Sequence, residues 1–371
     1  MTRKKQEELE QAYRNGAKVY SISRCNTINQ CLYQAYNAYI LNRRGLKNIY
    51  GVLGGRIHEV LEQIVNGDAK TEELLWAMKD ELNDLDMLSI AFPKDMRGND
   101  TIKNNWVADM THFCTHFVPP KGKFVTEEFF LYKLKPNRYV QGYIDLIRIN
   151  KDGTLSIYDW KTSSKFNKAD LLHHGRQLVL YALAMESLGY TIKNIGWIML
   201  KYAKIEYMGK KRANSKEDSL ITKVVNRGKI VQELKGNLEV DLQKLGIDNV
   251  DAEVMLFEAL ENNSLDNMPK EIIDKYKITP YIENYSLTDE LKQECLDYIN
   301  KQADLFESLN PDNPDEFPPR EFTKINSKGI EVEDTFFCQT LCSYRTECKY
   351  IREHRERKEA EEEKNWEDDL F

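Results

Sequence analysis

The stretch from Gly142 to Lys161 constrains this chain most, because it has the pattern of a β-hairpin. β-Branched and aromatic residues fill 144–149 and 155–160, and such runs favour strands. Between them, the Lys-Asp-Gly sequence at 151–153 is typical of a tight turn. We therefore expect two antiparallel strands here, joined by a short loop.

The register of this hairpin brings two acids together. A turn centred on Asp152 pairs residues whose numbers sum to 304, so Asp145 faces Asp159 and Lys161 projects from the same face. Two like charges directly opposed are destabilising unless a positive charge lies between them, and a divalent cation would serve. The alternative is a solvated pair on an open sheet face, but apolar residues flank the acids on that face and favour the metal.

Composition indicates a soluble globular protein. The chain has 371 residues, of which 41% are hydrophobic, and its net charge is -7. The N-terminus is charged and lacks an apolar core, and no run approaches the ~20 apolar residues of a membrane span, so we expect a cytoplasmic protein that does not contact membranes. Seven cysteines in such a chain point to metal binding or catalysis.

The remaining pattern predicts helices, then a short sheet, then further helices. This order fits a mixed α/β core, with a basic segment at 201–235 and an acid-rich tail from Glu359. We expect one capped helix over 21–41, helices over 52–65, 71–117 with a break near 92–93, and 168–188, strands over 124–133, 138–149, 154–161 and 195–201, helical structure over 237–308, and a loop over 311–319.

Read in order, four short motifs resemble a known family. They are GxxxHxxLE at 54–62, GxxD ending at Asp145, DxK at 159–161 and QxxxY at 177–181. Together they resemble the PD-(D/E)XK nuclease superfamily, in its RecB-like exonuclease branch. The resemblance implies a restriction-endonuclease-like α/β core, with a mixed central sheet flanked by helices, a helical insertion and a C-terminal cysteine segment.

The resemblance also implies a metal site. Asp145 and Asp159 are hard oxygen ligands suited to Mg²⁺ or Mn²⁺, and family precedent adds the main-chain carbonyl of Trp160. In the RecB-like branch the motif histidine, here His58, joins the metal ligands, and an imidazole suits Mn²⁺ better than Mg²⁺. These residues would support hydrolysis of a phosphodiester by a metal-activated water.

Other residues of the motifs would act beside the metal. The resemblance implies that Lys161 holds the attacking water or the scissile phosphate, and that Gln177 and Tyr181 contact DNA or orient Lys161. Those two residues are four apart on a predicted helix and so share a face. Glu127 or Glu128, on the preceding strand, could supply a further carboxylate, and the pattern leaves open which of them points inward.

The cysteines suggest a second metal centre. Cys338, Cys342 and Cys348, together with the remote Cys31, resemble the 4Fe-4S centre of the AddB-type recombination nucleases and the CRISPR-associated spacer-acquisition nucleases. The resemblance selects Cys31 over Cys25, because the upstream ligand follows a Ser-x-Ser-Arg start. The first spacing is CxxxC where the family usually has CxxC. Zn²⁺ held by the same four thiolates remains the alternative, since the number of thiolates does not choose the metal.

These features divide the chain into five regions. In order they are a charged arm (1–20), the nuclease core (21–202), a basic and helical elaboration (203–325), the iron-sulfur segment joined to Cys31 (326–352) and an acidic tail (353–371).

The expected function is a metal-dependent DNA exonuclease that acts from a DNA end in recombination, repair or phage DNA metabolism. Aromatic residues and the basic segment 201–235 would line its strand-binding groove. One alternative is a CRISPR-type pre-spacer processing nuclease. Another is a DNA-binding scaffold without chemistry, against which the intact Asp145, Asp159 and Lys161 argue.

The acidic tail allows two interpretations. Its composition fits a disordered, solvated end, yet Trp366, Leu370 and Phe371 are not needed for disorder. The end resembles the tip of bacterial single-stranded-DNA-binding proteins, and Asp369-Leu370-Phe371 resembles the sliding-clamp-binding peptide. Either resemblance implies that Trp366–Phe371 binds a replication or repair protein.

Overall fold

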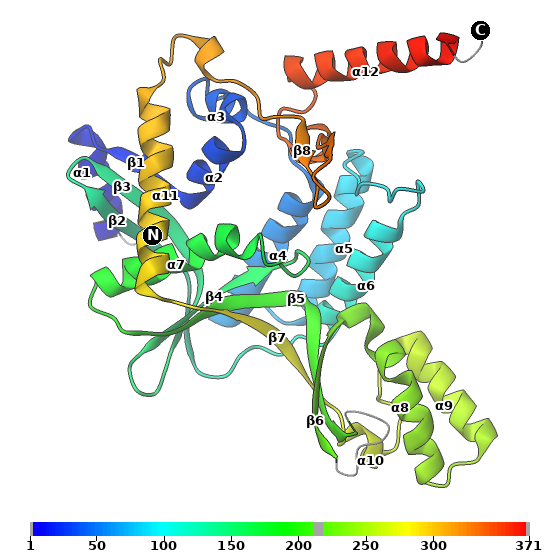
Figure 1. Cartoon of the computed structure of the whole chain (residues 1–371). Coiled ribbons are helices and arrows are strands. Elements are labelled where there is room, and N and C mark those ends of the chain that lie inside the picture. The colour runs from blue at the N-terminus through cyan, green and yellow to red at the C-terminus, as the bar shows by residue number, and fades with distance from the viewer. Residues whose placement is uncertain (1–2, 211–217, 369–371) are drawn as a thin grey trace. The chain divides into compact units, whose positions relative to one another are not determined.

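The computed structural model describes residues 3–210 and 218–368, and places side chains for 6–210 and 218–361. The fold is mixed α/β, with a central mixed sheet flanked by helices, as the sequence predicted (Figure 1). The chain divides into two compact units, and the division falls within strands β2 and β3. The first unit comprises 1–52, 129–142 and 288–371, and the second comprises 53–128 and 143–287.

The first unit is built from both ends of the chain. β1 pairs in parallel with the start of β3, where Lys18 is the partner of Arg138. The elements of the first unit are α1 (Arg3–Arg14), β1 (Lys18–Tyr20), α2 (Ile22–Gln30), α3 (Leu32–Tyr39), α11 (Asp289–Ser308), η2 (Pro314–Glu316), the hairpin β8 (Thr323–Ile325) and β9 (Glu331–Glu333), the π-turn η3 (Phe337–Leu341) and α12 (Lys349–Asp368). The strands β2 (Lys123–Lys135) and β3 (Arg138–Ile149) each contribute residues to both units.

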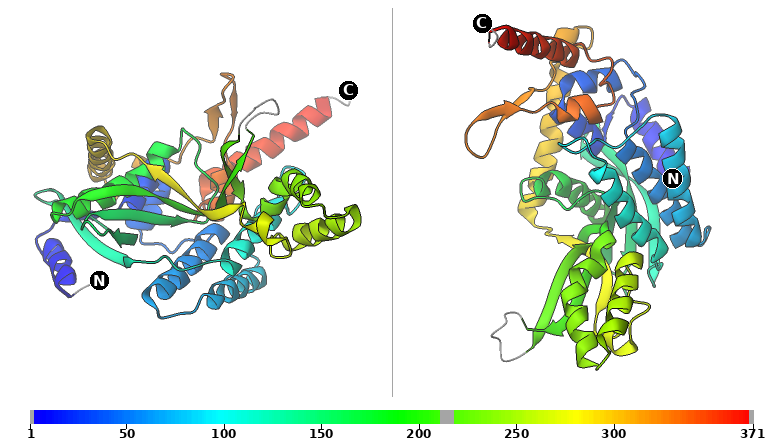
Figure 2. Two further views of the ribbon diagram at one scale, coloured as in Figure 1. Left: turned by 90° about the horizontal axis from the view of Figure 1, so that it is seen from below. Right: turned by 90° about the vertical axis from the view of Figure 1, so that its right-hand side faces the viewer.

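The second unit holds most of the sheet. Its strands are β4 (Leu155–Lys161), β5 (Ile192–Gly209), β6 (Ser219–Asn226) and β7 (Lys277–Tyr285). Its helices are α4 (Ile49–Asn66), which begins just before the unit, α5 (Glu72–Met87), α6 (Thr101–Thr115), α7 (Leu171–Ser187), η1 (Arg227–Lys229), α8 (Ile230–Lys244), α9 (Asn249–Asn262) and α10 (Lys270–Ile273). Figure 2 gives two further views of these elements.

The hairpin register is the predicted one. β3 and β4 are antiparallel, and Leu146 pairs with Tyr158 and Ile149 with Leu155, so each pair of numbers sums to 304. The turn is closed by Gly153, whose φ of +81° lies in the left-handed region that glycine adopts without strain. β4 continues the sheet in parallel with β5, and β5 pairs antiparallel with both β6 and β7.

The single helix expected over 21–41 is wrong, because the structure has two helices that meet at Cys31. α2 is capped by the Ser21 side chain, which accepts a hydrogen bond from the backbone N–H of Arg24 at 3.1 Å. Cys31 itself is extended, with φ −165° and ψ 112°, and so it ends α2 and begins α3. The apolar stripe of the sequence continues across the break, which is why the periodicity did not reveal it.

The helical structure expected over 237–308 also needs correction, because β7 interrupts it. The sequence KITPYIENY alternates exposed and less exposed residues, the pattern of a strand at the surface. Helices α8 to α10 and strands β5 and β6 share a core that includes Leu234, Leu238 and Leu256. The segment from β6 to β7 is thus built onto β5, and we call it the inserted region (219–285).

Asp109 on α6 anchors the inserted region. Its buried carboxylate accepts hydrogen bonds from the Asn226 side chain at 2.8 Å and from the backbone N–H of Gly228 at 2.9 Å. A Cβ atom on Gly228 would lie only 2.8 Å from the Cβ of Ala108, so a glycine is needed for this close approach. The inserted region is therefore held by polar contacts as well as by its core.

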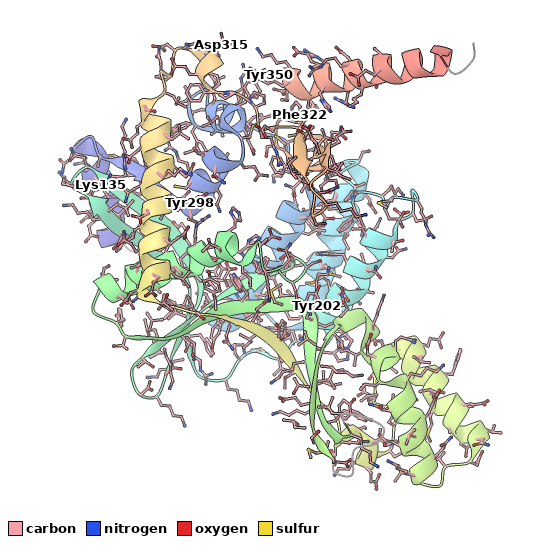
Figure 3. The ribbon with its side chains drawn as sticks, viewed as in Figure 1. Lys135, Tyr202, Tyr298, Asp315, Phe322 and Tyr350 are labelled. Carbon is pink, nitrogen blue, oxygen red and sulfur yellow. The ribbon has the colours of Figure 1, made fainter. Side chains whose placement is uncertain are left out.

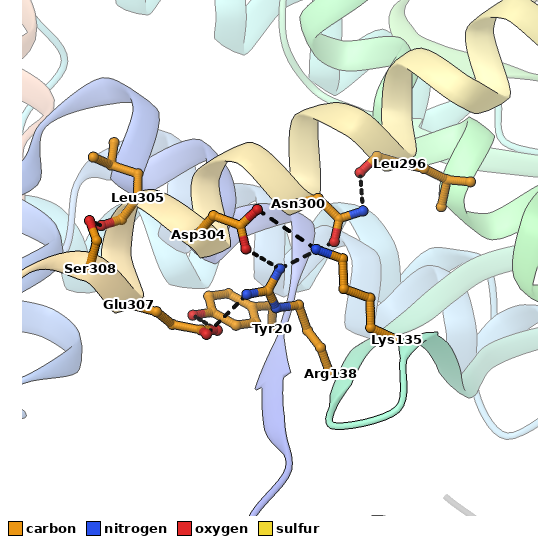
Figure 4. A network of polar contacts seen from close by, with 9 residues as sticks. All are labelled: Tyr20, Lys135, Arg138, Leu296, Asn300, Asp304, Leu305, Glu307 and Ser308. Carbon is orange, nitrogen blue, oxygen red and sulfur yellow. Dashed lines mark hydrogen bonds and ion pairs between the residues drawn. The ribbon is translucent and has the colours of Figure 1, made fainter.

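In the first unit, Arg138 ties α11 to the start of β3 (Figure 4). Its guanidinium donates to Asp304 Oδ1 at 2.7 Å, to Glu307 Oε2 at 2.9 Å and to Asn300 Oδ1 at 3.2 Å. The Tyr20 hydroxyl donates to the other oxygen of Glu307 at 2.8 Å, which links β1 to the same helix. Tyr298, labelled on α11 in Figure 3, donates to the Asn26 side chain of α2 at 2.9 Å.

We predict that Arg138→Ala lowers the free energy of unfolding by about 2 kcal/mol. The change removes charge-assisted hydrogen bonds and leaves Asp304 and Glu307 without their guanidinium partner. Lys135→Ala is the matched control. Its ammonium lies 3.7 Å from the same Asp304 but is exposed, so its loss should change stability by less than about 0.5 kcal/mol. Urea unfolding measures both variants, and equal effects would contradict a special role for Arg138.

Candidate active site

The two hairpin acids lie side by side in the second unit. Leu146 pairs with Tyr158, and continuing the hairpin register by one more pair places Asp145 opposite Asp159. The Asp159 side chain is 1% exposed, and the backbone N–H of Trp160 donates to Asp145 Oδ2 at 3.2 Å. The structure thus brings these predicted residues together, on strands whose other side chains are largely buried.

Lys161 lies between the acids and α7. Its ammonium is 2.5 Å from Asp159 Oδ2 and donates to Gln177 Oε1 at 3.3 Å. The amide of Gln177 in turn donates to the Tyr181 hydroxyl at 2.7 Å. These two residues share a face of α7, as their spacing predicted, and α7 packs on β4. The chain of contacts fixes the position of the lysine.

His58 approaches the acids from α4. Its Nδ1 lies 3.3 Å from Asp145 Oδ2. Burial lowers the pKa of His58, with Lys161 acting in the same direction and Asp159 against it. The imidazole is therefore neutral at neutral pH, which is the form that binds metal ions.

Glu127 on β2 is within electrostatic range of the site acids. Burial raises its pKa, and the charges of Glu62 and Asp159 raise it further. Its φ of +47° is unusual for a residue with a side chain, and it breaks the regular alternation along β2. Strand periodicity alone therefore could not have chosen between Glu127 and Glu128. The sequence signal for Glu62 was its place one turn after His58.

The site carries an excess of negative charge. Burial raises the pKa of Asp145 well above its usual range, and the neighbouring Asp159 raises it further. Burial also raises the pKa of Tyr181, and both aspartates add to this effect. Lys161 is one ammonium beside several carboxyl groups, so an added cation would be favoured.

The donor set fits a hard divalent cation. Carboxylates from β3 and β4 and a neutral imidazole from α4 lie within one site, and oxygen ligands with an imidazole suit Mg²⁺ or Mn²⁺. Among the residues that the structure describes, no three His, Cys, Asp or Glu side chains converge tightly enough to hold a metal ion as they stand. Instead, His58 contacts a carboxylate oxygen of Asp145, and Lys161 contacts one of Asp159.

The four predicted cysteines all belong to the first unit and lie near enough to influence one another's charge. All are free thiols. Burial raises the pKa of Cys338 to about 12, and the nearby Cys31, Cys342 and Cys348 add to this effect. Cys342 accepts a hydrogen bond from the backbone N–H of Tyr344 at 3.4 Å, and burial raises its pKa to about 11. Such thiols stay protonated without a metal, and a thiophilic ion would deprotonate them.

Part of the basic segment 201–235 is turned into the interior, while Lys229 and Lys235 of the same segment are exposed. Lys201 is buried with its ammonium 3.8 Å from Asp109, and Arg227 is buried with its guanidinium over the Phe113 ring. Lys204 pairs with Glu206 at 3.0 Å. Lys201 and Arg227 are thus interior cations, because β5 and η1 carry them into the core. Lys211, Arg212 and Lys216 lie outside the described residues.

The acidic tail begins on α12. The helix includes the backbone of Trp366, while the side chain of Trp366 and all of Leu370 and Phe371 lie outside the described residues. Along the described chain, none of the helices combines the length and the apolar character needed to cross a membrane.

Comparison with known families decides the relationship. A family model described as the PD-(D/E)XK nuclease superfamily matches residues 19–349. The chain belongs to the PD-(D/E)XK nuclease superfamily. No match was found among curated proteins. Membership in the superfamily indicates a metal-dependent nuclease, and nucleases of this superfamily typically use Mg²⁺ or Mn²⁺.

We predict that Asp145→Asn stabilises the metal-free protein by about 1–2 kcal/mol at neutral pH, because it removes a buried charge opposite Asp159. With a raised pKa, the folded state binds a proton that the unfolded chain has released. The contribution of Asp145 to stability is therefore full below about pH 4 and is lost as pH rises through the raised pKa, and Asp145→Asn should flatten this decline. Unfolding in chelator across this pH range measures the effect.

The control is Asp152→Asn in the turn of the same hairpin. Hydrogen bonds from Thr154 and then from Lys193 lower the pKa of Asp152 to about 2, so this change should lower stability rather than raise it. If Asp145→Asn destabilises the protein instead, the negative charge of Asp145 is not unfavourable in the folded state, and the prediction is wrong.

Proposed function

We propose that this protein is a Mg²⁺- or Mn²⁺-dependent DNA exonuclease of the RecB-like branch, which hydrolyses phosphodiester bonds from a DNA end. The observation that carries the proposal is the buried pair Asp145 and Asp159 with Lys161 2.5 Å from the latter. The motif histidine beside Asp145 supports the RecB-like branch. Recombination, repair or phage DNA metabolism would supply such ends.

Each residue of the site has a role in this proposal. Asp145 and Asp159 would hold the metal with the Trp160 carbonyl and His58. A bound divalent cation would supply Lewis acidity and lower the pKa of the attacking water. Lys161 would hold that water or the scissile phosphate and offset charge that develops on the phosphate oxygens.

The residues on α7 would act through the lysine. Gln177 accepts a hydrogen bond from Lys161 at 3.3 Å and is itself held by Tyr181, so this pair would orient the ammonium. Contact with DNA is the other role that the motif allows. Glu127 and Glu62 would add negative charge that strengthens metal binding.

We also propose that Cys31, Cys338, Cys342 and Cys348 hold a 4Fe-4S cluster, with Zn²⁺ as the alternative. Support comes from four free thiols that influence one another's charge, two of them at irregular backbone positions. Cys31 lies at the break between α2 and α3, and Cys338 lies in the π-turn η3. A centre that joins residues more than three hundred positions apart would mainly stabilise the fold.

Two further parts of the proposal concern partners and pathway. The tail residues Trp366–Phe371 would bind a replication or repair protein, through apolar anchors set among acids. A CRISPR-type pre-spacer nuclease would use the same site, and only the substrate would differ. A scaffold without chemistry is disfavoured by the complete set Asp145, Asp159 and Lys161.

We predict that Asp145→Ala, Asp159→Ala and Lys161→Ala each lower cleavage of end-labelled DNA at least about 100-fold, because each removes a metal ligand or the group that positions the reacting atoms. DNA binding should survive, since affinity is spread over many phosphate contacts. Assays with Mn²⁺, Mg²⁺ or chelator measure cleavage, and gel shifts in Ca²⁺ measure binding.

Asp152→Ala in the turn serves as the matched control and should keep full activity. Near-normal metal-dependent turnover by Asp159→Ala would refute the assignment of this hairpin. A circular substrate that is cut as fast as a linear one would refute the exonuclease mode.

We predict that protein purified without oxygen is brown, with broad absorbance near about 400 nm from thiolate-bound iron. Cys31→Ala and Cys342→Ala should lose the colour and melt at lower temperature, because metal binding contributes folding free energy. Cys25→Ala is the matched control on α2. Its thiol is also buried but is not one of the four proposed ligands, so the colour should remain. Colourless protein with stoichiometric zinc would replace the iron-sulfur centre by a zinc site.

A further inference from the structure

Helix α9 of the inserted region is apolar on two opposite faces. Leu256 and Ala259 are buried in the core that α9 shares with α8. The opposite face carries Val250, Val254 and Phe257, which are 71%, 53% and 65% exposed. Their spacing of four and three residues places them on one stripe, which we call the α9 stripe. In Figure 1, α9 forms the outer edge of the inserted region, beside α8.

The α9 stripe is unusual for a helix at the surface. A helix that packs on one side normally presents polar residues on the other, because exposed apolar area is unfavourable. Single exposed apolar residues are common, but three that are contiguous along two turns indicate an interaction surface. Neither the core of the inserted region nor the candidate active site uses these side chains.

The charges of α9 restrict what can cover the stripe. The helix carries Asp251, Glu253, Glu258 and Glu261, and has no Lys or Arg between 249 and 262. Nucleic acid and anionic membrane surfaces would be repelled by these acids. A second copy of the chain, paired through the same face, would bring the acids of both helices together.

We propose that the α9 stripe is a docking surface for a basic amphipathic helix of a partner protein. Apolar side chains of that helix would pack on Val250, Val254 and Phe257, and its Lys and Arg would pair with the acids beside them. The spacing of the stripe matches the i, i+4, i+7 anchors by which helices bind each other. Phe257 would be the main anchor, because aromatic residues dominate such contacts.

A synthetic probe tests this surface directly. The probe is a fluorescein-labelled peptide of Leu and Lys, about 18 residues long, with leucines at helical spacing so that it folds on binding. A second peptide has the same composition with the leucines scattered. Fluorescence anisotropy in about 0.15 M salt should show at least about tenfold tighter binding of the first peptide.

Variants identify where the peptide binds. Phe257→Ser and Val254→Ser should each weaken the helical peptide about tenfold, and Glu253→Gln should weaken it less. Trp76→Ser on α5 is the matched control. Trp76 is 64% exposed and also lies near acids in the sequence, but it is not part of an apolar stripe. Its replacement should therefore not change binding of the helical peptide. Circular dichroism should show that every variant remains folded.

Three outcomes would overturn the proposal. If both peptides bind equally tightly, charge alone attracts them. If Trp76→Ser weakens binding of the helical peptide as much as Phe257→Ser does, the effect of the variants is nonspecific. Dimerisation of the wild-type chain that Phe257→Ser abolishes, seen by light scattering, would assign the stripe to a second copy. Nuclease activity enters none of these measurements, so failure of the proposed function leaves them unaffected.

Discussion

The opposition of two buried carboxylates is the constraint on which the site depends. The register of β3 and β4 places Asp145 opposite Asp159, and their side chains are only 11% and 1% exposed. Each nearby contact offsets this arrangement. Lys161 neutralises Asp159, and the backbone N–H of Trp160 and the ring of His58 contact Asp145. A rigid site that is short of positive charge is already organised for a cation, which is how metal-dependent hydrolysis gains rate.

Buried charge also fixes the parts of the fold away from the site. Arg138 holds α11 in the first unit, and Asp109 holds the inserted region in the second. In both cases one buried ionic group contacts several partners, so loss of a single side chain would leave the others unsatisfied. Such contacts give specificity of position, because apolar packing alone would tolerate sliding of one element over another.

Local sequence was sufficient where structure depends on neighbours in the chain. The turn chemistry of Lys151-Asp152-Gly153 fixed the hairpin register, and the register placed Asp145 opposite Asp159. The spacing of Gln177 and Tyr181 predicted their shared helix face, and the match to the superfamily was confirmed. The helix break at Cys31 and the strand β7 were missed, because both arise from contacts with distant segments.

The sequence by itself thus determined the family, the hairpin and the acids that face each other. Side chains alternate along a strand with a period of two, and a tight turn then allows only one pairing register between the two strands. Only the tertiary structure showed that Glu127 has a left-handed φ, which breaks the strand period, and that burial and neighbouring acids raise its pKa. It also decided that Lys201 and Arg227 are interior cations, and that α9 exposes a second apolar face. Charge and hydrophobicity along a chain do not specify which side a residue presents, because burial is set by what other segments pack against it.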